Sequence, residues 1–381
     1  MVEAIVHVGV HKTGTSSIQR VMRRYRDRLL EQGFLYPGFA PNHYDIHTAF
    51  CSDPLRYHMV RGRGLKTLEE VDELRARVLG SVEQELRESR APKLLLCSED
   101  IHILDAEELG RFRTWLEGIG VTRTTVFIYL RDHISFWESQ VQQSVKGGNV
   151  LDLRHEARQL SKMREYRGHL EDLARVFGRQ NVRANAFVPD QLAGGDVIVD
   201  FAGKVGLDLT DMELVRANES LSRDAMLFLN EMNRRIATYG EHGRSLFRDG
   251  LLENLRSHRG EKFRADRATA ERIVGRSAED RAYLKESWFD GADPLGDAMA
   301  RTVAKLDAGA DEIAVAPDPA GTLDVVEHLY RGLKAENLKL SADRFRLKGL
   351  MKRDEDPQRS KEFLEKSRRL KRELQFVAKG E

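Results

Sequence analysis

The sequence lacks most of the features that mark exported, metal-stapled or membrane-spanning proteins. Only two cysteines, Cys51 and Cys97, occur among 381 residues, and neither stands in a CxxC pair. Two such cysteines cannot form a disulfide framework and do not indicate a zinc site, so two reduced thiols are expected. No apolar run approaches the roughly 20 residues of a membrane helix, and the apolar start of the chain ends at Gly9, too early for a signal peptide. We therefore expect a soluble, cytoplasmic protein.

The sequence also lacks an excess of either charge. Lysine and arginine total 62, and aspartate and glutamate total 61, which gives a net charge of +1. A protein that binds nucleic acid through a basic surface carries a clear positive excess, so no nucleic-acid partner is expected. The balance is uneven along the chain, because residues 331–381 contain 16 basic and 9 acidic side chains, a net of +7, which leaves −6 for the rest.

The basic C-terminal segment has the pattern of a helix. Phe363, Leu370, Leu374 and Val377 stand near heptad spacing with basic residues between them. Such a helix is expected to pack on the main domain or to associate with a second copy of the chain. Docking to an anionic membrane surface or to an anionic polymer is the alternative.

Four short apolar runs alternate with longer helical patterns in the first half of the chain. The runs are Ala4–Val8, Lys93–Cys97, Thr125–Leu130 and the weaker Val182–Phe187, and an amphipathic stretch from Ser16 to Leu30 follows the first. Continuous apolar strands separated by helices are typical of a parallel sheet covered on both faces. This pattern places the chain in the α/β class.

The pattern becomes helical after Val188. The segments with apolar residues every three to four positions are 200–205, 221–236 and 268–289. Ala316–Gly321 is predicted to be a linker, because proline and glycine stop helices. We expect an α/β domain with a helical extension at 1–295 and a helical segment with a basic tail at 296–381.

A loop rich in glycine and hydroxyl residues follows the first strand and precedes the first helix. Small residues let backbone N–H groups approach an anion, the helix N-terminus adds partial positive charge, and Lys12 adds a full charge. The loop therefore predicts a phosphate or sulfate cradle. Its candidate ligands are Gly9, His11, Lys12, Thr13, Gly14, Thr15 and Ser16. Because Lys12 precedes the second glycine, the loop departs from the GxxxxGK[ST] pattern of nucleotide kinases.

A second candidate anion site follows the third apolar run. Arg131 stands at the carboxyl end of this strand, where ligands bind in open α/β sheets, and Ser139 comes eight residues later on the next helix. An arginine can hold a phosphate through two parallel hydrogen bonds, and a serine hydroxyl can add a third. Pairing of Arg131 with Asp132 or Glu138 is the alternative.

The segment Lys12–Ser16 resembles the 5′-phosphosulfate-binding loop of sulfotransferases that use 3′-phosphoadenosine 5′-phosphosulfate, and it is most similar to bacterial, carbohydrate-type members. Arg131 and Ser139 keep the spacing of the arginine and serine that bind the 3′-phosphate of the donor in that family. The similarity covers the chain from Met1 to about Asp290 and implies a P-loop-like three-layer fold. It also implies transfer of a sulfuryl group from this co-substrate to a hydroxyl acceptor, a carbohydrate or glycolipid, without a metal ion.

Sulfuryl transfer needs a base for the acceptor's proton and positive charge near the oxygen that leaves sulfur. Lys12 suits the second role. Family members use a histidine or a glutamate as base, and Ser-Glu after the second apolar run resembles the glutamate type, so Glu99 is the predicted base. His102 is the second choice, because an ordinary histidine pKa of about 6.5 suits a base. Alternatively, Ser98 caps a helix and Glu99 is a carboxylate of its first turn.

The sequence indicates the acceptor-binding residues less clearly than the donor-binding residues or the base. His43 and His47 would share one face of a helix, where they could line an acceptor pocket, lie on a polar surface or hold zinc, although no third ligand has clear spacing. Gln142, Gln143 and Lys146, on the helix after the third run, could also reach an acceptor.

Two other functions stay open. A P-loop kinase or NTPase is disfavoured by the early position of Lys12 and by the lack of an obvious strand-terminal aspartate for Mg²⁺. The other is a non-catalytic scaffold that keeps a nucleotide-binding fold and acts through its basic helical tail.

Overall fold

A computed structural model describes residues 1–10, 12–39, 43–214, 220–235, 239–240, 243–244, 246–306, 319–351 and 357–379. Five strands form one sheet in which every neighbouring pair is parallel, which confirms the α/β class. From edge to edge they are β2 (Phe34–Leu35), β3 (Lys93–Cys97), β1 (Val2–His7), β4 (Val121–Leu130) and β5 (Val182–Ala186). Four of them are the predicted runs, whereas β2 has only two residues and gives no periodic signal.

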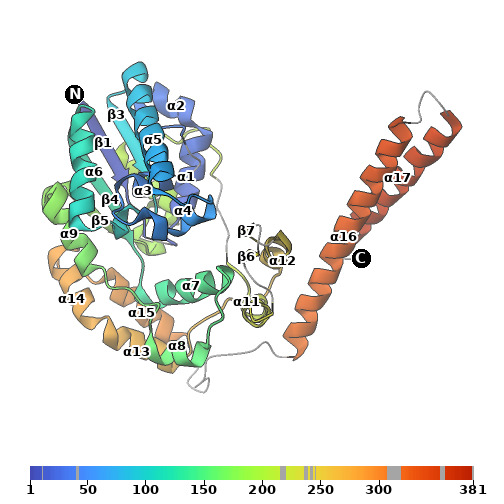
Figure 1. The fold of residues 1–381 in the computed structure, drawn as a ribbon. Coiled ribbons are helices and arrows are strands. Elements are labelled where there is room, and N and C mark those ends of the chain that lie inside the picture. The colour runs from blue at the N-terminus through green and yellow to red at the C-terminus, as the bar shows by residue number, and fades with distance from the viewer. Residues whose placement is uncertain are drawn as a thin grey trace.

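Both faces of the sheet are buried. Successive residues of a strand point to opposite faces, so each strand contributes side chains to two cores. Ala4 and Val6 belong to the core on one face, and Ile5 belongs to the core on the other. The helices over the first face include α3 (Tyr44–Phe50), α5 (Leu68–Ser89), α6 (Ala106–Gly118) and α9 (Arg167–Phe177). Those over the second face include α1 (Thr15–Arg24), α2 (Arg26–Glu31) and α10 (Val197–Val205). The body therefore has three layers around its sheet (Figure 1).

The single helix predicted over residues 16–30 is divided in two. Tyr25 separates α1 from α2, and its φ of −111° is not helical. Both helices still bury apolar residues against the same face of the sheet, Ile18 and Met22 from α1 and Leu29 from α2.

The rest of the body is helical and has a core of its own, which we call the helical core. Its largest buried side chain is Trp137 on α7. The helices that build it are α7 (His133–Lys146), α8 (Leu153–Gln159), α11 (Arg223–Met232), α12 (Leu246–Ser257), α13 (Arg267–Arg276) and α15 (Pro294–Ala304). The remaining elements of the body are α4 (His58–Gly62), β6 (Tyr239–Gly240), β7 (Gly243–Arg244) and α14 (Ala278–Ser287). The predicted domain boundary after residue 295 falls inside α15.

A long helical hairpin follows the body and extends away from it (Figure 1). It consists of α16 (Pro319–Met351) and α17 (Pro357–Lys379). Val325 is fully buried in the helical core, so the start of α16 is fixed against α11 and α12. Further along, Phe345 stacks on Phe363 with ring centroids 6.1 Å apart, and the Ser367 hydroxyl donates to the Ala342 carbonyl over 2.8 Å. The basic helix α17 therefore packs on α16 of its own chain.

The predicted linker is only partly described. Residues 316–318 lie outside the described residues, whereas Pro319–Gly321 open α16. Proline fits there because the first turn of a helix needs no N–H donor. The side chains of Leu374 and Val377 also lie outside the description. Of the helices in the described ranges, none is both long enough and apolar enough to cross a membrane.

Candidate functional site

A cavity of about 930 Å³ opens beside the carboxyl ends of the parallel strands. Strands β3 and β4 lie on either side of β1, so the segments that follow these three strands meet there. Open α/β sheets bind ligands at such a point, because connections leave it in opposite directions. The residues predicted from the sequence that line the cavity are Lys12, Gly14, Thr15, Ser16, Glu99, Arg131, Ser139, Gln142, Gln143 and Lys146.

The loop after β1 is shaped by two glycines that no other residue could replace without strain. Gly9 has φ of 71° and Gly14 has φ of 82°, both in the left-handed region. A Cβ on Gly14 would lie 2.5 Å from Val197 Cγ1, and one on Gly9 would lie 2.9 Å from Glu99 Cα. Lys12 also has a positive φ, 67°. The loop is therefore folded tightly against the segment after β3 and the first residue of α10.

The start of α1 has the properties of an anion site. Gly14 provides no side-chain cap and the first turn holds no acidic residue. Its carbonyl accepts from the N–H groups of Ser17 and Ile18, whereas the N–H groups of Thr15 and Ser16 stand where a helix supplies no acceptor. Among the described residues, the buried Thr15 hydroxyl has no hydrogen-bond partner. A bound anion would satisfy these donors and the helix dipole together.

Two predicted members of the cradle do not line the cavity. The Thr13 hydroxyl donates to the Val10 carbonyl over 2.7 Å, and its side chain is fully buried. Thr13 thus fastens the loop, and Gly9 shapes it. His11 lies outside the described residues.

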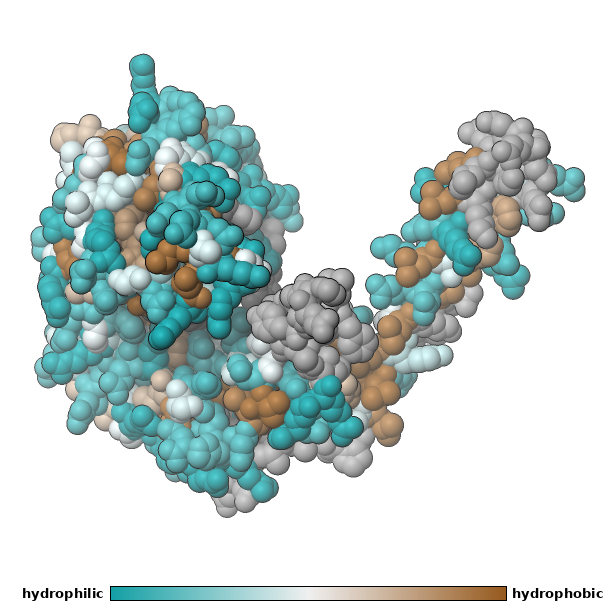
Figure 2. All heavy atoms as spheres, viewed as in Figure 1, coloured by the Kyte–Doolittle hydropathy of each residue, from teal (hydrophilic) through white to brown (hydrophobic). Residues whose placement is uncertain are grey.

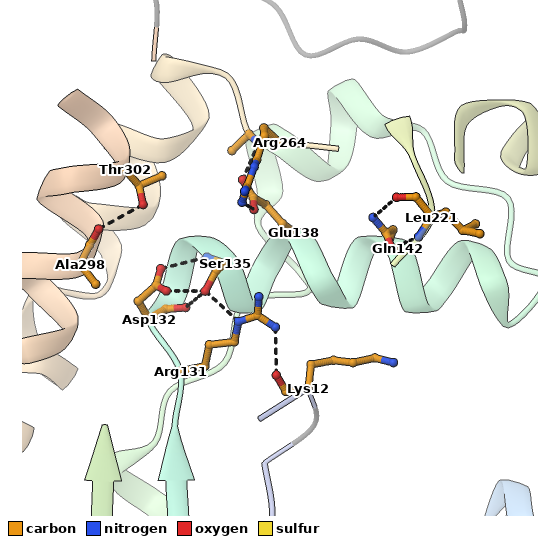
Figure 3. A network of polar contacts seen from close by, with 11 residues as sticks. Lys12, Arg131, Asp132, Ser135, Glu138, Gln142, Leu221, Arg264, Ala298 and Thr302 are labelled. Atoms are coloured by element: carbon orange, nitrogen blue, oxygen red, sulfur yellow. Dashed lines mark hydrogen bonds and ion pairs between the residues drawn. The ribbon is translucent and has the colours of Figure 1, made fainter. Parts of the chain in front are cut away.

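Arg131 joins the loop after β1 to the start of α7 (Figure 3). Its Nη1 donates to the Lys12 carbonyl over 3.0 Å and its Nε donates to Ser135 Oγ over 2.8 Å. Burial lowers the pKa of the guanidinium, because it removes water from the charged form. Ser139 follows Ser135 by one helical turn and lines the same cavity.

The alternative partners of Arg131 are engaged elsewhere. Asp132 caps α7, since its Oδ1 accepts from the Ser135 N–H over 2.9 Å. Glu138 pairs with Arg264, whose Nη1 donates to Glu138 Oε2 over 2.9 Å. The hydrogen bonds of Arg131 therefore go to neutral oxygens, while the nearby charges of Asp132 and Glu138 raise its pKa and oppose the effect of burial.

Glu99 lines the cavity directly after β3. Its Oε1 accepts from the Lys12 N–H over 3.3 Å, and its Oε2 accepts from the Tyr44 hydroxyl over 3.1 Å. The short helical turn that follows begins only at Ile101, after Asp100, so Ser98 does not cap a helix that contains Glu99. The reading of Glu99 as an ordinary first-turn carboxylate therefore does not hold.

His102 lies behind Glu99. It is 1% exposed, its Nδ1 lies 2.6 Å from the Glu99 carbonyl oxygen, and its Nε2 contacts Arg164. It does not line the cavity. Of the two predicted bases, only Glu99 reaches the space in which a reaction could occur.

His43 and His47 are buried packing residues. His43 is fully buried, its Nδ1 accepts the Cys97 N–H over 3.1 Å and its Nε2 lies 3.1 Å from the Pro37 carbonyl oxygen. Burial lowers the pKa of His43 to about 4 and also lowers the pKa of His47, whose ring packs on Tyr57 with centroids 4.2 Å apart. Neither residue lines the cavity, so the cavity gives no support to the acceptor-pocket prediction for this pair. Within the described ranges, no group of three His, Cys, Asp or Glu side chains could hold a metal ion.

Arg264 lines the cavity although no local sequence signal marks it. Arg264 comes from the segment between α12 and α13, and both it and the Ala265 N–H bind the carboxylate of Glu138 (Figure 3). Burial raises the pKa of Glu138, and the charge of Arg264 opposes that rise. The Gln142 amide bonds both the carbonyl and the N–H of Leu221, over 3.3 and 3.1 Å. These pairs join α7 to the segments that precede α11 and α13, beside one wall of the cavity.

Comparison of the chain with models of known protein families, with curated proteins and with solved structures finds no match. The assignment of a function therefore depends on the chemistry of the cavity.

Proposed function

We propose that the protein is a sulfotransferase that moves a sulfuryl group from 3′-phosphoadenosine 5′-phosphosulfate to a hydroxyl acceptor. The observation that carries the proposal is one cavity lined by an uncapped helix N-terminus, by Lys12 and Arg131, and by the carboxylate of Glu99. The first three favour an anion with more than one charged group, and the last is a proton acceptor. The P-loop-like character of the fold belongs to the same proposal, supported by a cradle that directly follows the central strand β1.

The residues present fit such a donor. Lys12, Thr15 and Ser16 would hold the 5′-phosphosulfate at the start of α1, and the unpartnered Thr15 hydroxyl matches this role. Arg131 and Ser139 would hold the 3′-phosphate. An apolar part of the lining, suited to a purine base, consists of Phe187, Leu192, Val197 and Ile198. When bound, the donor supplies the sulfuryl group and a phosphate leaving group.

The roles of the protein's own residues follow from their charges. Glu99 would accept the proton of the acceptor hydroxyl while the acceptor oxygen forms its bond to sulfur and the bond from sulfur to the phosphate oxygen breaks. Lys12 would stabilise the negative charge on that phosphate oxygen, and the N-terminus of α1 would add partial positive charge. The N–H of Lys12 donates to the Glu99 carboxylate, so the proposed base and the charged loop are held at a fixed position relative to each other.

The acceptor would enter beside Glu99. Tyr44 donates to Glu99 there, and the other polar side chains of the lining include Gln143 and Lys146 on α7 and Lys262 and Arg264 between α12 and α13. Donors and acceptors of this kind suit hydroxyl-rich molecules, and carbohydrates and glycolipids are such molecules. The proposal therefore keeps a sugar hydroxyl as the acceptor.

Calorimetry with 3′-phosphoadenosine 5′-phosphate tests the donor site. We expect binding that needs no added metal and that is weakened in Arg131→Ala, whereas Arg113→Ala, on the surface of α6, serves as the matched control and binds normally. A lack of heat at high micromolar nucleotide, together with Mg²⁺-dependent binding of ATP, would point to a kinase or NTPase. A screen of hydroxyl acceptors with labelled donor then identifies the second substrate.

A further inference from the structure

The outward face of α16 carries an apolar seam along the whole length of the hairpin. Its members are half or more exposed in most cases and recur at intervals of three, four and seven residues. They are Leu323 (70% exposed), Val326 (47%), Tyr330 (66%), Leu333 (56%), Leu340 (65%) and Leu347 (61%). Figure 2 shows hydrophobic side chains following one another along the hairpin. An exposed apolar row of this length marks an interaction surface.

The seam is distinct from the face that α16 uses within its own chain. Val325 and Ala342 are fully buried, and Phe345 packs on Phe363 of α17. These residues lie on the side of the helix away from the seam, because a helix turns by about 100° per residue. The body and α17 thus cover one face of α16 and leave the seam to a partner.

The spacing identifies the geometry of that partner. Residues at alternating intervals of three and four occupy the a and d positions of a heptad, with Leu323 and Tyr330 at a and Val326, Leu333, Leu340 and Leu347 at d. A strict a/d row is the narrow seam of a coiled coil, whereas a helix lying on a membrane has a wider apolar face. The remaining two a positions, which lie between Leu333 and Leu347, hold the polar residues Asn337 and Arg344.

We propose that α16 pairs with α16 of a second copy of this chain, as a parallel two-stranded coiled coil. Parallel pairing sets each residue of the seam beside its own counterpart, so Asn337 meets Asn337 and the two amides can hydrogen-bond, a device that fixes register and strand number. Arg344, also at an a position, meets the Arg344 of the other helix, and Asp343 at the g position that precedes it offsets these like charges.

The charges beside the seam favour a protein partner over a lipid surface. The positions that flank the row carry charges of both signs, with Glu327, Glu336 and Asp343 interspersed with Lys334 and Lys348. Mixed charges of this kind are usual beside the seam of a coiled coil, whereas a helix that lies on an anionic membrane has a basic polar face. The basic residues of α17 lie on the other helix, which packs against the covered face of α16. A second copy therefore matches the seam in shape, polarity and charge.

The oligomeric state of the full-length chain tests the proposal. Sedimentation equilibrium is expected to show a dimer, and the double variant Leu333→Glu/Leu340→Glu is expected to raise its dissociation constant about 100-fold or more. Lys339→Glu adds a negative charge to the same helix outside the seam and should leave the dimer intact. Circular dichroism checks that every variant keeps its helical content.

A cross-link tests the register and does not depend on disruptive variants. Leu340→Cys is expected to form a disulfide between two copies under mild oxidation, whereas Lys339→Cys is not, because only residues of the seam meet their counterparts in a parallel pair. A monomeric wild-type chain at high micromolar concentration overturns the proposal, as does a dimer that both the seam variants and Lys339→Glu leave unchanged. Binding of the monomer to vesicles containing phosphatidylserine, lost in the Leu333→Glu/Leu340→Glu variant, would assign the seam to a membrane instead.

Discussion

The cavity and the seam of α16 differ in how the chain builds them. In the cavity, the bonded groups come from distant parts of the sequence: Lys12 and Glu99 are 87 residues apart, and Glu138 and Arg264 are 126 residues apart. The seam lies on a single helix and repeats every three to four residues. A change in the cavity should therefore alter chemistry or ligand binding without altering assembly, and a change in the seam should do the reverse.

Glu99→Gln should have the largest effect on turnover. The amide keeps an oxygen for the Lys12 N–H but cannot take a proton, so we expect sulfuryl transfer to fall by about 10²- to 10⁴-fold. Donor affinity should stay near the wild-type value, because the carboxylate is not among the proposed donor ligands. Turnover and calorimetry measured side by side separate the two quantities, and Glu107→Gln, exposed on α6, is the matched control. Unchanged turnover would remove Glu99 from the mechanism.

Lys12→Gln should slow the reaction by about 10²- to 10³-fold, the usual cost of losing one charged group that stabilises a leaving oxygen. The slow hydrolysis of the donor, followed as release of 3′-phosphoadenosine 5′-phosphate, gives a readout that needs no acceptor. Lys285→Gln on α14 provides the comparison. If the Lys12 variant hydrolysed the donor at the wild-type rate, its proposed role would be lost.

Arg131→Ala should weaken binding of 3′-phosphoadenosine 5′-phosphate by about 10- to 100-fold, since hydrogen bonds to a charged group contribute about 1.5–3 kcal/mol. Ser139→Ala, which removes a single hydroxyl, should cost less. Adenosine 5′-phosphate, which has no 3′-phosphate, should bind both variants about as well as it binds the wild type. An equal loss for the two nucleotides would mean that Arg131 acts by holding the loop rather than by binding the 3′-phosphate.

Asp280→Ala should destabilise the body by about 2–3 kcal/mol, because it leaves buried donors without an acceptor. The carboxylate accepts from the N–H groups of Tyr166 and Arg167, over 2.9–3.1 Å, and lies 3.0 Å from His133 Nε2. Burial alone would raise the pKa of Asp280, but the hydrogen bonds from His133 and from the Tyr166 and Arg167 amides lower it below its usual value.

The sign of the pH effect follows from that lowered pKa. The stabilisation by Asp280 is complete above the ordinary aspartate pKa of about 4 and is lost as the pH falls through the lower value of the folded protein. Urea titrations at several pH values should show the wild-type chain approaching the stability of the variant in acid. A constant difference between the two across this range would contradict the assignment.

Ending the chain after Gly332 should have the smallest effect on the cavity. The shortened α16 keeps Val325 in the helical core, so we expect donor affinity within about 2-fold of the wild type, while the dimer is lost with half of the seam. In the full chain, Val325→Ala should instead cost about 2 kcal/mol of stability by opening a cavity in that core. A large loss of donor affinity on truncation would show that the hairpin and the cavity are coupled.

Much of the fold was predictable because its signals are local. The strands at 93–97 and 182–186 lie within the apolar runs that indicated them, and the α/β class follows from their alternation with helices. Two-residue strands such as β2 carry no periodicity, and the break between α1 and α2 has no proline or glycine to mark it. In the helical hairpin, the heptad spacing of α17 is evident from the sequence, whereas the seam of α16 became apparent only from the exposure of its side chains.

Those parts of the candidate site that one short segment supplies were predictable from the sequence. Those parts that several distant segments build together were not. By itself, the sequence determined that a loop rich in glycine and hydroxyl residues follows β1 and that Arg131 stands at the end of a strand, because these features depend on a few neighbouring residues. Only the tertiary structure decided that Glu99 reaches the cavity while His102 lies behind it, that His43 is buried and neutral, and that Arg264 completes the wall beside Glu138. Burial and long-range pairing depend on where distant segments meet, and they set the exposure and the charge of a side chain more strongly than its neighbours in the sequence do.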